Sequence, residues 1–310
     1  MQIKGTHTAL ITPFNSDYSV DYDSFKNLIE LQIAAGVEGI VIMGTTGEAP
    51  TIEDPEMEKI FDFASSTIAG RCICTVGTSS NVTKKTIEEN KLAAKCNADA
   101  VLISSPYYNK PTQKGLIEHY TAISEQTDLP IILYNVPSRT AVNIDVETIA
   151  KLSELKNIVA LKEASGDLEQ VKAVITSTSD DFNLLSGNDD QNLEIIKLGG
   201  MGTISVASNP IPQLVKQIID LGLAGEFDAA EKINSGFAQF FEDIFIENNP
   251  TAIKTLMAHL GHCKEVLRLP LTTMEAQNKA KLIASWDSVQ GILKEQLAET
   301  PSTSQAAGHP

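Results

Sequence analysis

A lysine at the end of a short apolar segment is the residue in this chain best placed to act as a nucleophile. Residues 158–162 place four apolar side chains in an unbroken run before Lys162, which predicts a buried strand. Because side chains alternate along a strand, we expect Ile158, Ala160 and Lys162 to share one face. Such a lysine can lay its stem on apolar surface and keep its ammonium in water, or it can lose its charge and form a Schiff base with a carbonyl. The segment alone leaves both interpretations open.

A tyrosine and an arginine follow the preceding apolar segment, residues 130–134. Ile132 and Tyr134 share a face of this segment, so we expect Tyr134 to point the same way as Lys162. Neighbouring strands lie about 4.8 Å apart, so the phenol and the amine could meet one small substrate. Arg139 follows in a loop stiffened by Pro137, and its guanidinium suits a substrate carboxylate. A solvated surface arginine is an equal alternative.

Four further loops carry polar groups at the ends of apolar segments. In Gly-Thr-Thr-Gly-Glu at 44–48, glycines flank Thr45 and Thr46 and expose backbone N–H groups that suit an anion, although a plain glycine turn is as good an interpretation. Tyr107 and Tyr108 stand between prolines in a stiff loop, where Tyr107 is typical of a packing residue. Residues 186–190 and 202–210 offer backbone groups, and Asp189 resembles the start of a helix.

A metal site is not predicted. His259 and His262 fall on one helical segment, but no nearby carboxylate completes a ligand set, and Cys263 beside them is more typical of core.

The elements that must position these residues repeat at intervals of roughly 25 to 30 residues. Eight apolar runs are followed by turn-rich stretches and then by helical patterns, which predicts parallel strands buried on both faces and favours a (β/α)8 TIM barrel. A doubly wound open sheet is the rival, but no Gly-x-Gly-x-x-Gly follows the first run. The predicted strands are residues 8–12, 39–43, 72–76, 100–104, 130–134, 158–162, 182–185 and 202–206.

The helical patterns continue after the strand signal stops. We predict a barrel over residues 1–224, a C-terminal helical extension over 225–297 and a disordered tail over 298–310. The helices expected between the strands are 21–35, 83–96, 113–126, 145–155, 168–178, 190–198 and 212–221, and those of the extension are 226–247, 251–260 and 274–297.

Composition excludes several classes of partner. With 24 Lys and Arg against 40 Asp and Glu, the net charge is 24 − 40 = −16, and no basic patch suggests a nucleic-acid partner. No apolar run reaches the length of a membrane span, and no secretion signal precedes the first strand. The four cysteines form no Cys-x-x-Cys pair and predict reduced core thiols in a cytoplasmic protein.

Several motifs together resemble those of the pyruvate-dependent lyases, the family that contains the dihydrodipicolinate synthases and N-acetylneuraminate lyase. They are GTTGE (44–48), PYYNKP (106–111), YNVPSRT (134–140), LKEASGD (161–167), SGND (186–189) and GTISVASNP (202–210). The resemblance runs in order over roughly residues 1–295, and several motifs in register make it specific.

The resemblance implies roles for individual residues. Lys162 would be the Schiff-base nucleophile for pyruvate, and no organic cofactor would be needed. Thr45 and Thr46 would hold the pyruvate carboxylate, while Thr46, Tyr134 and Tyr108 would form a proton relay. In the family the counterpart of Tyr108 reaches in from a neighbouring subunit, which implies a homotetramer built from two dimers.

The resemblance also implies a second substrate. Arg139 would bind the carboxylate of L-aspartate 4-semialdehyde, and the backbone of Gly187 and Ile204 would line the pocket. Sialic acid lyases usually lack this arginine and carry Ser-Thr in place of Thr45 and Thr46, so the synthase reaction is favoured. A sialic acid or other 2-keto acid aldolase and a non-catalytic pyruvate-binding barrel are the alternatives.

Regulation is expected to depart from that of the lysine-inhibited members. Asn81 and Tyr107 match the cleft in which those members bind lysine. However, Lys85 stands where they have a glutamate, and Met57 where many have a histidine. A cation in place of that carboxylate predicts weak or absent inhibition by lysine.

Overall fold

The predicted strands form one closed barrel. The structure, a computed structural model, describes residues 1–299. All strands are parallel and pair in chain order, and β8 closes on β1. The expected (β/α)8 architecture is therefore confirmed. The strands are β1 (Gly5–Ala9), β2 (Gly39–Ile42), β3 (Ile73–Gly77), β4 (Ala100–Ser104), β5 (Ile131–Asn135), β6 (Ile158–Glu163), β7 (Asn183–Ser186) and β8 (Gly202–Ser205).

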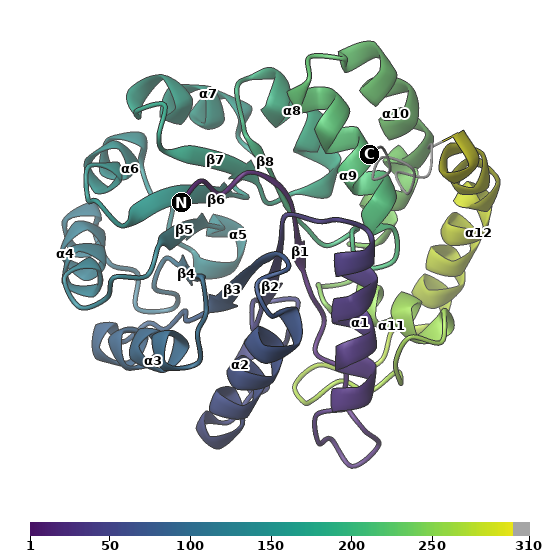
Figure 1. The fold of residues 1–310 in the computed structure, drawn as a ribbon, viewed down its shortest axis with the longest axis horizontal. Coiled ribbons are helices and arrows are strands. Elements are labelled where there is room, and N and C mark those ends of the chain that lie inside the picture. Colours follow the sequence, from purple (N-terminus) through teal and green to yellow (C-terminus); the bar gives the residue numbers. More distant parts are fainter. Residues whose placement is uncertain (300–310) are drawn as a thin grey trace, which may run out of the picture.

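Helices cover the outside of the barrel, and three more follow β8 and α9 at one side (Figure 1). Those of the barrel are α1 (Tyr22–Ala34), α2 (Asp54–Ile68), α3 (Thr83–Lys95), α4 (Gln113–Ser124), α5 (Pro137–Thr140), α6 (Val146–Ser153), α7 (Leu168–Ser177), α8 (Asn192–Lys197) and α9 (Pro212–Leu223). Those of the extension are α10 (Phe227–Asp243), α11 (Thr251–His259) and α12 (Ala276–Glu299).

The strands bury both faces, as parallel strands between helices must. Inward side chains such as Val41, Leu102 and Ile132 form a compact inner cluster with Tyr134, and outward ones pack with the helices in a larger cluster. Because the interior is filled, the free space for a ligand lies at the ends of the barrel.

The prediction that Ile158 shares a strand face with Ala160 and Lys162 is wrong. Ile131 pairs with Ile158, but Ile132 pairs with Ala160, so the register between β5 and β6 shifts at this point. Ile158 consequently packs in the outer cluster, while Ala160 belongs to the inner one. Strict alternation fails there because the irregularity uses one extra residue of β6.

Strand β1 differs from its predicted extent, and one helix was not predicted. Strand β1 begins at Gly5 rather than residue 8, and Leu10 and Ile11 are buried beyond its end. Helix α2 was not among the predicted helices, although Ile60 and Phe61 are fully buried on its inner side. Pro55 resembles a helix breaker, yet it lies in the first turn of α2, where proline is tolerated.

The extension packs alongside α9. Helix α12 runs along α10, with the rings of Phe240 and Trp286 5.6 Å apart between their centroids. Helix α12 ends at Glu299, two residues beyond the predicted end, and the rest of the predicted tail lies outside the described residues. The predicted domain boundary near residue 224 stays a prediction. No helix in the described part of the chain is long and apolar enough to cross a membrane.

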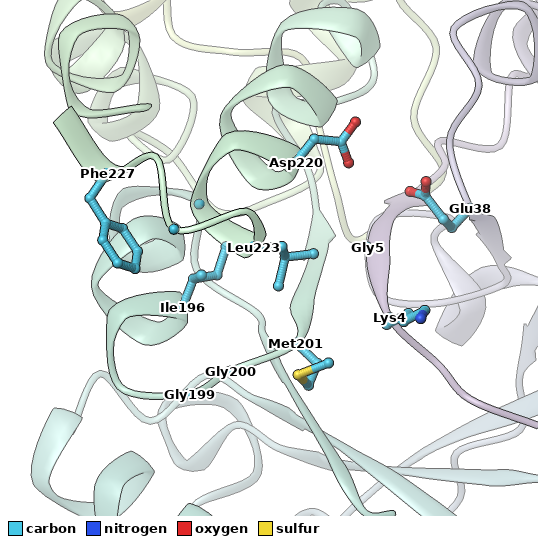
Figure 2. A pocket seen from close by; sticks show the side chains of 12 residues that line it. Lys4, Gly5, Glu38, Ile196, Gly199, Gly200, Met201, Asp220, Leu223 and Phe227 are labelled. Atoms are coloured by element: carbon cyan, nitrogen blue, oxygen red, sulfur yellow. The ribbon is translucent and has the colours of Figure 1, made fainter. Parts of the chain in front are cut away.

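The amino-terminal end of the barrel holds a cavity of about 540 Å³. Met201, Leu223 and Phe227 line it together with Glu38 and Asp220, and Figure 2 shows Phe227 on the side opposite Glu38. Both carboxylates are bound by Lys216, and none of the candidate site residues lines this cavity. The candidate chemistry is therefore at the opposite end.

Candidate active site

Lys162 and Tyr134 face each other at the carboxyl ends of neighbouring strands. They are register partners of β6 and β5, and the Lys162 Nζ lies 4.4 Å from the centroid of the Tyr134 ring. Both line a cavity of about 150 Å³, and the lysine is only 5% exposed. The predicted meeting of amine and phenol is confirmed, and the snorkelling alternative is excluded because Lys162 does not reach solvent.

The surroundings of Lys162 favour its neutral form. Burial lowers the pKa of Lys162 to about 8, the positive charge of Arg139 adds to this, and the negative charge of Asp189 opposes it. At pH 7 about one lysine in ten is then a free amine, compared with about one in 2,500 for an unperturbed side chain. The amine is consequently available for attack on a carbonyl.

The two threonines follow β2 and reach the same cavity. Burial raises the pKa of Tyr134, and the neighbouring Thr45 side chain acts against this. Thr46 is buried and its Oγ1 accepts a hydrogen bond of 2.9 Å from Asn249 Nδ2. The expected relay through Thr46 stays a prediction.

Gly47 lets this loop turn tightly. A Cβ at Gly47 would lie 3.1 Å from the Met43 backbone nitrogen and 3.2 Å from Thr12 Oγ1. Thr12 Oγ1 also donates to the Gly47 carbonyl at 2.7 Å. The glycine thus brings the threonine pair close against the strand end.

A buried ion pair holds the far end of the same loop. Glu48 Oε1 lies 2.5 Å from Lys254 Nζ, and both side chains are fully buried. The Arg268 backbone N–H donates to the other Glu48 oxygen at 3.0 Å, and the Lys254 ammonium lies 4.0 Å from the centroid of the Phe14 ring. These contacts join the threonine loop to helix α11, in the extension.

Arg139 lies on a single helical turn rather than in an open loop. Pro137 begins α5, and Arg139 Nη2 donates to the Asn249 carbonyl at 3.2 Å. Arg139 lines the cavity together with Lys162, and among the lining residues, all of them described, these are the charged ones. Two cations in one small cavity suit an anionic substrate.

Asn249 and Phe245 are site residues that sequence reasoning missed. Both come from the segment between α10 and α11 and line the cavity from the side of the extension. The Asn-Pro step at 249–250 signals a turn. Nothing in the local sequence connects that turn to strands near residue 46, so only the fold identifies it.

Gly187 packs directly against the lysine. A Cβ there would lie 2.9 Å from Lys162 Cε, so a larger residue would displace the lysine stem. The contribution of the Ile204 backbone stays a prediction. The Ile204 side chain is fully buried in the inner cluster, and Val206, just beyond the end of β8, lines the cavity.

Tyr108 is not brought to the site within one chain. Its side chain is 89% exposed, it does not line the cavity, and its backbone has a positive φ of 74°. A non-glycine residue in this conformation is strained. The loop therefore keeps the Tyr108 side chain in solvent, although burial of a tyrosine would stabilise the fold.

A second cavity of about 360 Å³ adjoins the first and shares Thr45 and Tyr134 with it. Tyr107, Met57 and Lys85 line it, so Tyr107 is not only a packing residue. Lys85 Nζ lies 3.2 Å from Asp54 Oδ1 and 3.8 Å from Glu89 Oε1, and burial raises the pKa of Glu89 to about 7. Asn81 does not line this cavity, but its Nδ2 donates to the Tyr107 carbonyl at 3.2 Å.

The remaining candidate ligands are not gathered. Within residues 1–299 no group of three His, Cys, Asp or Glu side chains is placed to hold a metal ion. The four cysteines are unpaired, and burial raises the pKa of Cys74 to about 12, which keeps its thiol protonated.

Asp189 lies at a helix start, as predicted, but its carboxylate has a further role. A short 3₁₀ turn over Asp189–Gln191 precedes α8, and the buried carboxylate binds groups at the end of β8.

Comparisons with known proteins agree with this geometry. The sequence model of the Dihydrodipicolinate synthetase family matches residues 2–287. The 4-hydroxy-tetrahydrodipicolinate synthase of Aquifex aeolicus is 42% identical over 280 residues, 90% of this chain and 95% of the relative. That of Methanococcus maripaludis is 43% identical over 293 residues, 94% of this chain and 100% of the relative.

Solved structures give the same relationship. The crystal structure of dihydrodipicolinate synthase from Aquifex aeolicus superimposes with a TM-score of 0.90 at 40% identity, and the match covers 95% of this chain and 98% of that one. Sequence and structural similarity both extend over nearly the whole chain. The chain therefore belongs to the Dihydrodipicolinate synthetase family.

Proposed function

We propose that this chain is a lyase that condenses pyruvate with L-aspartate 4-semialdehyde, the reaction of a 4-hydroxy-tetrahydrodipicolinate synthase in the biosynthesis of diaminopimelate and lysine. The observation that carries the proposal is Lys162, buried beside Tyr134 in a small cavity, with a pKa lowered to about 8. The relatives named above carry the same activity in their names.

The lysine supplies the electron sink, so the proposal includes no organic cofactor. The neutral amine attacks the keto carbon of pyruvate, and the keto oxygen leaves as water. The protonated imine acidifies the methyl group, which loses a proton to give an enamine. The enamine carbon attacks the aldehyde, and the amine of the product then displaces Lys162 from the imine carbon and closes the ring.

The other residues bind and move protons. Thr45 and Thr46 hold the pyruvate carboxylate beside the lysine, and Tyr134 exchanges protons with the reacting oxygen. Thr46 and Tyr108 extend that relay. Gly187 leaves room for the lysine stem, and Arg139 binds the carboxylate of the aldehyde substrate at the cavity mouth.

The exposed Tyr108 supports an oligomer. The Tyr108 side chain is exposed on a strained backbone, from which it can enter the cavity of a neighbouring subunit. We infer a homotetramer in which pairs of subunits complete each other's sites. The four unpaired cysteines support a cytoplasmic location.

Arg139 distinguishes this reaction from that of a sialic acid lyase. The guanidinium of Arg139 fits an aldehyde that carries its own carboxylate. A non-catalytic pyruvate-binding barrel would have no use for a buried lysine with a lowered pKa.

We propose that free lysine inhibits this enzyme weakly or not at all. The ammonium of Lys85 lines the second cavity where lysine-sensitive members present a carboxylate, and it would repel the effector's α-amino group. Met57 supplies no hydrogen-bonding group in place of a histidine.

The proposal is tested in two assays. Borohydride added with pyruvate should trap an adduct on Lys162, read by mass spectrometry, and a coupled assay should show turnover of pyruvate with aspartate semialdehyde. No adduct would exclude the Schiff base. Faster turnover of sialic acid or of a 2-keto-3-deoxy sugar acid would replace the proposed substrate.

A further inference from the structure

A buried carboxylate next to the site has no place in the reaction described so far. Asp189 is 1% exposed and follows β7, two residues beyond the glycine that packs on the Lys162 stem. It does not line the substrate cavity, so it lies behind the wall and does not touch substrate.

Burial raises the pKa of Asp189, and its hydrogen-bond partners act against this and favour the carboxylate. The Ser205 hydroxyl donates to Asp189 Oδ1 at 2.5 Å, and the N–H groups of Val206 and Ala207 both donate to Oδ2 at 2.9 Å. Asn192 Nδ2 adds a longer contact of 3.4 Å. Ser205 Oγ also accepts a hydrogen bond from the Ser208 N–H. The two backbone N–H groups and the Asn192 amide can only donate to Asp189, and such donors stabilise the carboxylate more than the protonated acid.

The same contacts place the charge beside the lysine. Val206, whose N–H binds Asp189, lines the cavity with Lys162, and Lys162 is the register partner of Leu185 on β7. Asp189 is the negative charge that acts on the Lys162 ammonium, and Arg139 is the opposing positive one. Tyr134 is the other titratable group that faces the lysine, and it carries no charge at neutral pH because burial raises its pKa.

Schiff-base formation leaves a positive charge on the Lys162 nitrogen, which a nearby negative charge stabilises. The amine and the keto acid form one C–N bond, and the carbonyl C–O bond breaks. The oxygen leaves as water with one hydrogen from the amine and one proton from solvent. The nitrogen keeps one hydrogen and a full positive charge in a site from which water is excluded, where an unpaired cation is costly.

We propose that Asp189 is a positioning counter-ion, which stabilises the positive nitrogen of Lys162 through the cavity wall once the lysine has condensed with a 2-keto acid. This rests on the proposed Schiff-base function. Asp189 thus stabilises the imine electrostatically without touching the substrate.

The test compares Asp189→Asn with Asp190→Asn, a matched control on the exposed neighbouring carboxylate. The rate of borohydride-trapped pyruvate adduct formation is measured by mass spectrometry over a range of pH. In Asp189→Asn the ammonium loses its stabilising charge, so the acid limb of the profile should move down by about one pH unit. The yield of protonated imine at neutral pH should fall by only about twofold, because the free ammonium loses the same stabilising charge as the protonated imine. Asp190→Asn should match the wild type.

Each outcome is decisive. An Asp189→Asn profile with an unmoved acid limb overturns the counter-ion, even if the rate falls, because a merely structural defect lowers the rate at every pH. If circular dichroism shows that Asp189→Asn is unfolded, Ser205→Ala removes one donor and should move the limb in the same direction by a smaller amount; an unmoved limb again overturns the proposal. Absence of any adduct in the wild type refutes the Schiff-base function instead.

Discussion

Asn249 donates a hydrogen bond of 2.9 Å to Thr46, although the two residues are 203 positions apart in the chain. The donor belongs to the helical extension and the acceptor to the loop after β2. The carbonyl of the same asparagine accepts from Arg139. One residue of the extension therefore positions both groups that we propose to bind substrate carboxylates.

Replacing Asn249 with Ala should impair substrate binding more than folding. Thr46 and Arg139 each lose a partner, so we expect the KM for pyruvate to rise about tenfold, as the loss of about 1.4 kcal/mol in binding would give. Steady-state kinetics measure this. Asn248→Ala, on the exposed neighbour, is the control, and an equal effect there would contradict the role of Asn249.

Replacing Lys162 with Met should abolish the pyruvate adduct and stabilise the fold at neutral pH. The pKa of Lys162 is about 8 in the folded state, below the usual 10.5 of the unfolded chain, so the unfolded chain binds the proton more tightly. Below pH 8 the full cost of the buried ammonium is present, roughly 3 kcal/mol, and it declines as the pH rises from 8 to 10.5.

Urea unfolding of wild type and Lys162→Met at several pH values tests this sign. The variant's advantage should be largest near neutral pH and should shrink in alkali. An advantage that grows with pH would contradict the lowered pKa. Lys91→Met, on an exposed lysine of α3, provides the control for a loss of charge alone.

Replacing Arg139 with Ala should separate the two half-reactions. The pyruvate adduct should still form, because Lys162 and the threonine loop are intact, while turnover with aspartate semialdehyde should fall by about a hundredfold or more, since a charged hydrogen-bonding partner is lost. Trapping and the coupled assay read the two steps separately. Arg71→Ala, which breaks a surface ion pair with Glu30, should change neither.

Mixing subunits should test the role of Tyr108. Lys162→Ala and Tyr108→Phe are each expected to be nearly inactive alone. In a mixed dimer one site combines an intact Lys162 with an intact Tyr108 from the other chain, so activity should return after the two are unfolded and refolded together. If mixtures stay inactive while Tyr108→Phe alone is impaired, the tyrosine does not act across subunits.

Lysine should inhibit poorly, with an inhibition constant of about one millimolar or higher. Lys85→Glu restores the carboxylate expected in sensitive members, so it should lower that constant, whereas Lys84→Glu on the exposed neighbouring position should not. Tight inhibition of the wild type would show that the Lys85 charge, already shared with Asp54 and Glu89, no longer repels the effector.

The sequence by itself determined the class of fold and the two residues at its chemical centre. Buried parallel strands need continuous apolar runs, and eight such runs alternating with helical patterns leave few architectures. Lys162 and Tyr134 lie near the ends of neighbouring strands, so strand order and the alternation from Ile132 to Tyr134 and from Ala160 to Lys162 predict their meeting, although the irregularity in β6 reverses the facing of Ile158.

Only the tertiary structure decided what surrounds that centre. Asn249 reaches Thr46 because the extension folds back over the barrel mouth, and Asp189, at the start of a short 3₁₀ turn, also binds the end of β8 because β8 closes beside β7. Val206 lines the cavity because the chain passes close to Lys162 just after β8 ends. Such contacts join residues far apart in the chain, so they cannot be predicted from local patterns of apolar and polar residues.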